Sequence, residues 1–377
     1  MRIAVVTETY PPEINGVALT VHGFVEHLTR LGHAVDLVRP RQPGVSAPAG
    51  VHGEVLVAGA AIPRYPGLRF GLPSPRRIAQ AWRERRPDVA YIATEGPLGW
   101  SALNVANAMG IPAATGFHTR FDDYFVHYGA RLLKPAVAGW LRRFHNRGQA
   151  TLVPTRPLRD DLAARGFRNV QVLGRGVDTQ RFDPARRDAS LRAQWSVGDA
   201  GLAVGHVGRL APEKNLDLLV RAFRAIAAAV PGARMVWVGD GPARERLERE
   251  HIGHVFAGQR RDDDLGRHFA SLDLFLFPSL TETFGNVTVE AMAAGVPVVA
   301  FDYGAAREHL LDGVHGRAPA YGDEHGFIAA AVALARDAEV RRRMGAAARA
   351  AVAGLSRAAV AGQFAALLEG LAARRAA

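Results

Sequence analysis

Short apolar runs alternate with segments of helical spacing along almost all of this chain of 377 residues. The runs fall at residues 2–7, 34–38, 55–58, 89–94, 113–117 and 151–154, and again at 204–207, 235–238, 254–257, 272–277 and 296–301. Helical segments separate them at 17–31, 75–85, 99–109, 135–147, 216–230, 243–250, 263–271 and 287–294. Strands that alternate with helices form parallel sheets covered on both faces. The sequence therefore predicts an α/β protein with two doubly wound parallel sheets.

The boundary between the two units is expected near residues 174–184, a stretch interrupted by glycine and proline. This gives a first domain of residues 1–176 and a second of residues 177–356. The last segment, about residues 357–377, has the pattern of a helix with an apolar stripe that must pack on something. The stripe consists of Val360, Phe364, Leu367, Leu368 and Leu371.

A stretch of the second half holds two glutamates eight positions apart. Glu282 falls in the loop beyond the carboxyl end of a predicted strand, and Glu290 falls in the helix that follows, which Gly295 is expected to end. Open parallel sheets bind ligands at that edge, and Gly285 lets backbone amides approach a ligand near the positive end of the helix. The alternative interpretation is that Glu282 is a solvated loop residue and Glu290 a capping or surface residue of the helix.

The glutamate pair, with Phe-Gly in the loop and a helix ending in Ala-Gly-Val-Pro-Val-Val, resembles the signature of retaining nucleotide-sugar glycosyltransferases of family 4. The resemblance implies the GT-B fold: two Rossmann-like domains facing a central cleft, with the final helix crossing back to the first. It also implies that the first glutamate and the amides after it hold the hydroxyls of the donor sugar, while the second glutamate accepts from the ribose. The residues concerned are Glu282, Phe284, Gly285, Asn286 and Glu290. Carboxylates accept hydroxyl groups strongly without a metal.

Two positions of the first half also follow predicted strands. Gly16 precedes a helix, where it either allows close approach of a ligand or serves as an ordinary turn. By resemblance, Gly16 faces the donor phosphates and the acceptor, and His118 holds the primary hydroxyl of the sugar and helps to shape the anomeric centre. The Asp-Asp-Tyr run at 122–124 suits the acceptor side, and capping or solvated positions account for it equally well.

Arg209 and Lys214 lie between a buried strand and a helix. Two cations there can neutralise a diphosphate leaving group, whose charge grows as the glycosidic bond breaks. A solvated turn is the alternative, but the spacing of Gly-Arg with Lys five positions on matches the resembled family. Arg209 and Lys214 are therefore predicted to clamp the diphosphate.

The run Asp262 to Asp264 contains the Asp-x-Asp spacing of metal-dependent GT-A glycosyltransferases. It directly precedes a helical segment, where acidic residues cap amides and favour the helix dipole. Capping is the preferred interpretation. No metal site is expected, and no cofactor beyond the nucleotide diphosphate sugar that serves as donor substrate.

Most of the net charge of +11 belongs to the first half, since residues 1–176 hold 22 Lys and Arg against 12 Asp and Glu. Nucleic acid, an anionic membrane surface or an anionic substrate would each account for such a basic domain. The loop at 63–77 mixes basic and apolar side chains, as membrane interfaces do, although a rigid proline-rich connector is the alternative. These side chains are Arg64, Tyr65, Leu68, Arg69, Phe70, Leu72, Arg76 and Arg77. With no cysteine and no apolar run of 18 residues, a cytoplasmic protein, peripheral on the membrane, is expected.

The sequence thus predicts a metal-independent retaining hexosyltransferase that moves mannose or glucose from a nucleotide diphosphate sugar to a lipid or lipid-linked glycan acceptor. The lipid acceptor follows from the charge and from a likeness of the first half to the mannosyl-, glucosyl- and sulfoquinovosyl-lipid branch of the family. The alternatives are a soluble glycosyltransferase with a sugar acceptor and a non-enzymatic module that binds sugar nucleotides or nucleic acid. Nucleic acid is disfavoured because no aromatic platform for single strands is present. Nothing in the sequence indicates an oligomeric state.

Overall fold

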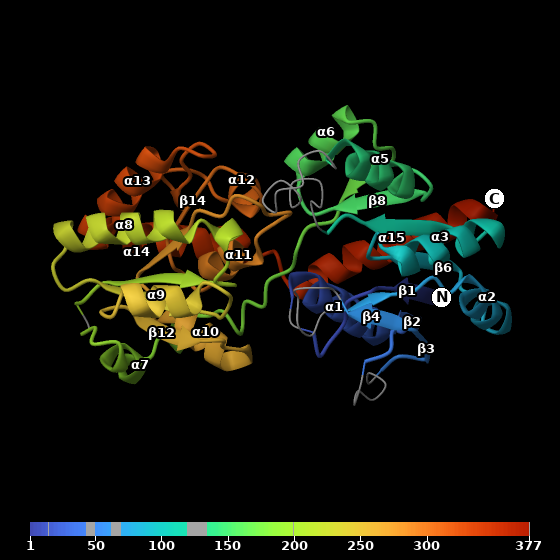
Figure 1. Cartoon of the computed structure of the whole chain (residues 1–377), viewed down its shortest axis with the longest axis horizontal. Coiled ribbons are helices and arrows are strands. Elements are labelled where there is room, and N and C mark those ends of the chain that lie inside the picture. The colour runs from blue at the N-terminus through green and yellow to red at the C-terminus, as the bar shows by residue number, and fades with distance from the viewer. Residues whose placement is uncertain (14, 43–49, 62–68, 119–133, 199, 377) are drawn as a thin grey trace. The chain divides into compact units, whose positions relative to one another are not determined.

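The chain divides into two compact units in the structure, a computed structural model that describes residues 1–13, 15–42, 50–61, 69–118, 134–198 and 200–376 (Figure 1). The first unit comprises Met1–Gly176 together with Arg357–Ala377, and the second comprises Val177–Ser356. The C-terminal helix, red in Figure 1, therefore belongs with the blue and teal elements of the first unit.

The first unit is built on a seven-stranded sheet of order β3-β2-β1-β6-β7-β8-β9, in which all neighbouring strands run parallel. Its strands are β1 (Arg2–Val6), β2 (Ala34–Pro40), β3 (Gly53–Val57), β6 (Val89–Ile92), β7 (Ala113–Gly116), β8 (Ala150–Val153) and β9 (Val170–Val172). Its helices include α1 (Gly16–Arg30), α2 (Pro75–Glu84), α3 (Pro97–Ala108), α5 (Lys134–His145), α6 (Arg156–Ala164) and α15 (Arg357–Ala376). A two-stranded antiparallel ribbon, β4 (Gly59–Ala61) with β5 (Arg69–Gly71), packs against β2 and α3.

Apolar cores cover the two faces of the first sheet. On one face, α1 and α15 pack over the central strands, and the ring of Phe364 lies 4.5 Å from that of Phe24 and 4.8 Å from that of Tyr91, centroid to centroid. On the other face, α2 contributes the buried side chains of Ile78 and Trp82. Each buried apolar side chain contributes about 1.5–3 kcal/mol to folding. The stripe predicted on the last helix is thus the face that holds α15 on the first unit.

The second unit is built on a six-stranded parallel sheet of order β12-β11-β10-β13-β14-β15. Its strands are β10 (Ala203–Val207), β11 (Arg234–Val238), β12 (Val255–Gly258), β13 (Leu274–Phe277), β14 (Val298–Ala300) and β15 (Gly316–Arg317). Its helices include α7 (Ala189–Gln194), α8 (Leu216–Ala229), α9 (Arg244–Glu250), α10 (Asp262–Ala270), α11 (Asn286–Ala293), α12 (Ala305–His309), α13 (Glu324–Arg336) and α14 (Ala338–Val352). The 3-10 turns η2 (Pro184–Arg186) and η3 (Pro212–Lys214) complete the elements used below.

The predicted α/β fold with two parallel sheets is confirmed. The end of α11 also forms as predicted, because Gly295 has a φ of 70° and lies just beyond the helix. Val296 donates its N–H to the carbonyl of Ala291 and Gly295 donates to that of Met292, each at 3.0 Å, which is a Schellman motif. The strands β4, β5, β9 and β15 were not predicted. Among the residues that the structure describes, no helix combines the length and apolar character needed to span a bilayer.

Candidate functional site

The order of the second sheet reverses between β10 and β13, so the loops that follow these two strands meet at one edge. Ligands of doubly wound sheets bind at such a reversal, beyond the carboxyl ends of the strands. After β10 come Arg209 and the short 3-10 turn that ends in Lys214. After β13 comes the loop that holds Glu282, and α11 then begins at Asn286. The structure therefore brings these predicted donor residues to the same edge.

Glycines hold the loops after β10 and β11 in close contact. A Cβ added to Gly239 would lie 1.9 Å from the carbonyl oxygen of Gly208, and one added to Gly241 would lie 2.5 Å from that of Leu210. The N–H of Leu210 donates to the carbonyl of Asp240 at 2.9 Å. Only glycine permits backbones to approach so closely, and both Gly239 and Gly241 also have positive φ. The position of the loop that carries Arg209 and Lys214 is therefore fixed by backbone packing.

Lys214 and Glu282 form a largely buried ion pair that joins the loops after β10 and β13. Their side chains are only 17% and 16% exposed. Ser279 donates its hydroxyl to Oε1 of Glu282 at 2.7 Å, and the Lys214 ammonium lies 5.6 Å from the centroid of the Phe277 ring. Arg209, the other predicted clamp residue, is exposed near the start of the same loop. The site thus presents a cation and a carboxylate that currently neutralise each other.

Sequence reasoning missed Glu213, which lies beneath this pair. Its backbone carbonyl accepts the N–H of Leu280 at 3.2 Å and the hydroxyl of Ser279 at 3.4 Å, so it ties the two loops together. The side chain is buried, and within the described ranges its Oε2 has no hydrogen-bond partner. An acid in a short turn ordinarily points to solvent, so no local signal distinguishes this residue.

The backbone around Phe284 and Gly285 is held by a second close approach. Gly285 has a φ of 92° and serves as N-cap of α11. The carbonyl of Phe284 accepts the N–H of Ala305 at 2.6 Å, and a Cβ on Gly304 would lie 2.5 Å from that carbonyl oxygen. The Phe284 side chain is buried. The loop therefore presents backbone at the positive end of α11, while its aromatic side chain packs inward.

Asn286 and Glu290 lie one helical turn apart on α11, so they occupy the same face of the helix. Both side chains are half-buried. A small pocket lies next to the loop, lined by side chains that include those of Glu282, Ser279 and Thr288. Carboxylate, hydroxyl and amide groups at the end of a helix suit a polyhydroxylated anionic ligand.

In the first unit, Gly16 is the exposed first residue of α1, directly after β1 and its loop. Asn15 caps this helix by accepting the N–H of Ala18 at 2.8 Å. Asn15 itself donates to Thr9 at 2.6 Å. Gly16 therefore lies at a rigidly capped, positive helix end at the carboxyl edge of the first sheet.

His118 follows β7 at the same edge of the first sheet and is half-buried. Its Nε2 lies 2.7 Å from the hydroxyl of Tyr91, and its Nδ1 accepts a hydrogen bond from the Arg175 guanidinium. Because a guanidinium only donates, the ring hydrogen must lie on Nε2. Burial lowers the pKa of His118 well below its usual value, and the charges of Arg175 and His145 lower it further. The ring is therefore neutral, with both nitrogens held by the protein.

Sequence reasoning also missed Glu8, which follows β1 at the point where the first sheet reverses. Its carboxylate accepts the N–H of Leu98 at 2.9 Å, at the beginning of α3. Burial raises the pKa of Glu8 from 4.5 to about 7, although backbone hydrogen bonds from Leu98 and Gly99 lower it. An acid in a strand-end loop gives no sign in the sequence that it will cap a helix 90 residues away.

Part of the predicted membrane and acceptor surface lies outside the described residues, namely Arg64, Tyr65, Leu68 and the Asp-Asp-Tyr run at 122–124. Arg69 belongs to β5 and donates to the carbonyl of Gly59 at 2.6 Å, so it has a structural role there. Phe70 is half-buried, whereas Leu72 and both Arg76 and Arg77 are exposed.

The aspartates of the Asp-x-Asp run lie in the first turn of α10, where they favour the helix dipole as expected. The capping interpretation is wrong, because the N-cap is Arg261 and no side chain caps the helix there. Arg181 lies 3.2 Å from Asp262, and Arg186 lies 3.3 Å from Asp263. Asp264 pairs with Arg267 at 2.8 Å. Each carboxylate thus has an arginine partner.

Two family models together match most of the chain. Residues 14–181 match the model described as "Glycosyltransferase Family 4", and residues 201–337 match the one described as "Glycosyl transferases group 1". A GDP-mannose-dependent alpha-mannosyltransferase of Mycolicibacterium smegmatis is 37% identical over 93% of this chain and 92% of its own. An alpha-monoglucosyldiacylglycerol synthase of Acholeplasma laidlawii is 28% identical over 79% of this chain and 80% of its own.

The fold has solved counterparts. The structure of a sucrose-phosphate synthase from Thermosynechococcus elongatus matches 99% of this chain and 99% of its own with a TM-score of 0.78 at 19% identity. At that identity the likeness concerns the fold, and the relationship rests on the sequence matches. The chain is a glycosyltransferase, and it belongs to glycosyltransferase family 4.

Proposed function

We propose that this protein is a retaining hexosyltransferase that moves a hexose from a nucleotide diphosphate sugar to a lipid or lipid-linked glycan acceptor. The observation that carries the proposal is the pair of Lys214 and Glu282 at the strand-order reversal of the second sheet. It offers a cation for the diphosphate and a carboxylate for the sugar hydroxyls, side by side. Mannose from GDP-mannose is the favoured donor, because the mycobacterial relative that spans more than nine tenths of both chains is named for it.

Donor binding would replace the ion pair with contacts from each of its two residues to a different part of the ligand. A diphosphate near the Lys214 ammonium gives that cation a stronger anionic partner, and sugar hydroxyls give the Glu282 carboxylate new hydrogen-bond donors. Ser279 continues to orient Glu282 during this exchange. The largely buried position strengthens each of these interactions relative to water. Glu290 of α11 is proposed to accept hydrogen bonds from the ribose hydroxyls, while the backbone amides at Gly285 and Asn286 join Glu282 in holding the hydroxyls of the donor sugar.

The reaction requires no nucleophile from the protein. The bond between the anomeric carbon and the diphosphate oxygen breaks, the acceptor oxygen bonds to the same face of that carbon, and the acceptor proton passes to the departing phosphate. Lys214 and Arg209 stabilise the negative charge that grows on the diphosphate. We propose that these two cations do the work that a divalent metal does in other glycosyltransferases. His118 is proposed to help to shape the anomeric centre, and it does so as a neutral ring whose two nitrogens are held by Tyr91 and Arg175.

The experiment that tests this proposal measures transfer from GDP-mannose in excess EDTA for the native protein, Lys214→Ala and the control Arg336→Gln, an exposed helix-end position in the same unit. Activity should survive EDTA, and Lys214→Ala should cost roughly 2–4 kcal/mol of transition-state stabilisation, as other electrostatic deletions do. Activity that disappears in EDTA and returns with Mn²⁺ would refute the metal-independent mechanism.

The lipid acceptor is supported by the glucosyldiacylglycerol synthase among the relatives and by the basic character of residues 1–176. The competing proposal is a soluble sugar acceptor. A direct comparison separates the two: the lipid acceptor requires transfer of labelled hexose into a chloroform-soluble product, whereas a soluble acceptor leaves the label in the aqueous phase.

A further inference from the structure

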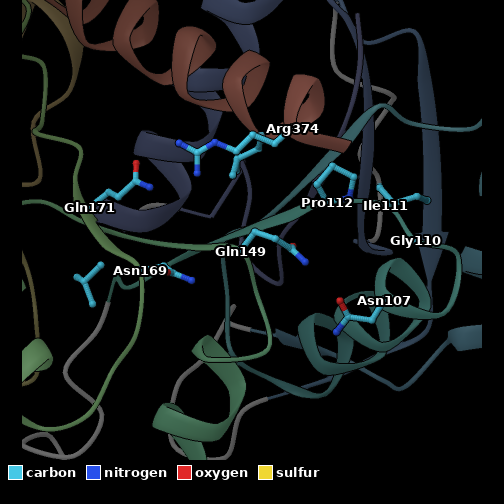
Figure 2. Close-up of a pocket in the computed structure, with 10 residues that line it drawn as sticks. Asn107, Gly110, Ile111, Pro112, Gln149, Asn169, Gln171 and Arg374 are labelled. Atoms are coloured by element: carbon cyan, nitrogen blue, oxygen red, sulfur yellow. The ribbon is translucent and has the colours of Figure 1, made fainter. Parts of the chain in front are cut away.

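A pocket of about 480 Å³ opens at the amino edge of the first sheet, the edge opposite to His118 (Figure 2). Pro112, Gln149 and Asn169 line it, and they directly precede β7, β8 and β9. The last turn of α15 closes it from the other side through Arg374. Pockets of this size bind small molecules in many proteins. The roles assigned above to donor and acceptor leave this pocket unexplained.

Two of the lining amides are held in a known orientation by backbone groups. The Oε1 of Gln149 accepts the N–H of Ala113 at 2.6 Å, so its NH₂ group is the end that remains to donate. The Nδ2 of Asn107 donates to the carbonyl of Arg147 at 3.3 Å, so its Oδ1 is the end that remains to accept. A pocket that presents an oriented donor and an oriented acceptor is suited to hydroxyl groups, which both donate and accept.

Among the ten residues that line the pocket, all in the described part of the chain, Arg374 carries the only formal charge. Figure 2 shows its side chain running from α15 toward Gln171. A guanidinium offers a planar set of donors that fits phosphate and carboxylate groups. The lining thus combines one anion-binding group with several amides.

We infer that this pocket is a second binding site, which takes a phosphorylated sugar or polyol with its phosphate on Arg374 and its hydroxyls on Gln149, Asn107 and their neighbours. The site lies wholly in the first unit and uses none of the predicted donor residues. The same helix α15 packs through Phe364 on Tyr91, whose hydroxyl lies beside His118. A bound ligand would therefore fasten the end of the helix that supports the candidate site from behind.

The test uses the full chain, titrated calorimetrically with glucose 6-phosphate and, for comparison, with glucose and with inorganic phosphate. Hydrogen exchange of residues 357–376 is measured with and without the sugar phosphate. Arg374→Gln removes the charge, and Arg336→Gln is its control, since it lies in the last turn of α13 in the other unit. We expect glucose 6-phosphate to bind, to protect the last turns of α15, and to bind at least about tenfold more weakly to Arg374→Gln, as for loss of a charged hydrogen bond.

A second pair of variants isolates charge within the pocket. Gly110 lines it with a φ of 62°, and a Cβ added there meets nothing within 4 Å. Asn and Asp tolerate this left-handed conformation better than other residues, so Gly110→Asn and Gly110→Asp differ mainly in charge. Gly110→Asp should weaken binding of the sugar phosphate more than Gly110→Asn does, because its carboxylate repels the phosphate.

Three outcomes would overturn the inference. They are no binding of glucose 6-phosphate at millimolar concentration, equal affinity in Arg374→Gln and Arg336→Gln, and protection located in residues 203–300 instead of 357–376. Binding of inorganic phosphate as tight as that of the sugar phosphate would overturn the part played by the amides. None of these results bears on donor binding in the second unit, so the inference and the proposed function fail separately.

Discussion

At the scale of single residues, Glu282 has more than one role in the unliganded site. It neutralises Lys214, accepts from Ser279 and lies in the loop that leads into α11. Removing it would therefore release a cation as well as remove an acceptor for sugar hydroxyls. The two effects act on different parts of a sugar nucleotide, which makes them separable by choice of ligand.

The first prediction concerns this division. Glu282→Ala should weaken binding of the sugar nucleotide by about 1.5–3 kcal/mol, the usual cost of losing charged hydrogen bonds. It should leave binding of the bare nucleotide diphosphate unchanged or tighter, because Lys214 no longer has an internal partner. Glu290→Ala should weaken binding of both ligands equally, since both contain the ribose. Calorimetry that finds the same loss for both ligands in Glu282→Ala contradicts these roles.

The second prediction concerns His206, a buried residue of β10 beneath the site. Burial lowers the pKa of His206 from 6.5 to about 4, with an opposing effect from the carbonyl of Leu276. Between those values the unfolded chain binds more protons than the folded one, so the free energy of unfolding falls as pH drops from about 6.5 to about 4. The slope due to this group is at most about 1.4 kcal/mol per pH unit.

His206→Phe removes the titrating group while keeping a ring stacked on Phe277. The melting temperature of this variant should fall less between pH 7 and pH 5 than that of the native protein. Since other buried histidines remain in both proteins, the difference between the two curves isolates His206. Parallel curves would show that His206 is not held neutral by the fold.

At the scale of elements, the site is built from strand-end loops that glycine allows to touch. Gly239 packs on Gly208, and Gly304 packs on Phe284, so two separate loops are fixed by backbone contact. The residues proposed to bind the donor therefore project from loops whose backbones are held by these contacts. Preorganisation of this kind lowers the cost of binding.

The third prediction compares two glycines of positive φ. Gly232→Ala should cost about 1–2 kcal/mol in stability, because the conformation is left-handed but the added Cβ meets nothing within 4 Å. Gly239→Ala is strained as well, at a φ of 144°, and its Cβ would also lie 1.9 Å from the carbonyl oxygen of Gly208. Gly239→Ala should therefore lower the free energy of unfolding, measured by chemical denaturation, by more than Gly232→Ala does. It should also weaken nucleotide binding. Equal effects of the two variants on nucleotide affinity would refute the role of this loop contact.

The elements that could be predicted are those whose signals are local. Apolar runs and helical spacing identify the parallel strands and their helices, and Gly295 ends α11 where its left-handed conformation is needed. The edge strand β9 escaped because its three residues are all half-buried and form no apolar run. The contact of His118 with Arg175 joins residues 57 positions apart, and the capping of α3 by Glu8 spans 90 positions. Spacing patterns hold no information on such pairs.

At the scale of the whole molecule, the two units share one strand order around the reversal but differ in charge. Residues 1–176 hold an excess of basic residues, whereas the strongest donor candidates all lie in Val177–Ser356. This separation favours a division in which the first unit meets an anionic surface or acceptor and the second binds the donor. Variants on one unit should therefore leave the function of the other intact.

The fourth prediction concerns the exposed arginines at the start of α2. Changing Arg76 and Arg77 together to Gln should weaken binding to anionic vesicles by roughly tenfold or more, at about 1 kcal/mol per arginine, and leave nucleotide affinity unchanged. The control changes Arg342 and Arg343, an adjacent exposed pair on α14 of the second unit, to Gln. Flotation at low and high salt measures both. Two results would contradict a membrane surface at α2. One is equal binding of the native protein to neutral and anionic vesicles, and the other is a loss of binding in the control variant as large as that in the Arg76 and Arg77 variant.

The most direct test of the whole account follows the anomeric carbon itself. The protein is incubated with GDP-mannose labelled with carbon-13 at that carbon, together with membrane lipids as acceptor, and the lipid product is examined by nuclear magnetic resonance. The account predicts mannosyl lipid with the same α configuration as the donor, formed by the native protein and strongly reduced with Glu282→Ala. A β-linked product, or label transferred to lipid equally well by Glu282→Ala, would contradict it.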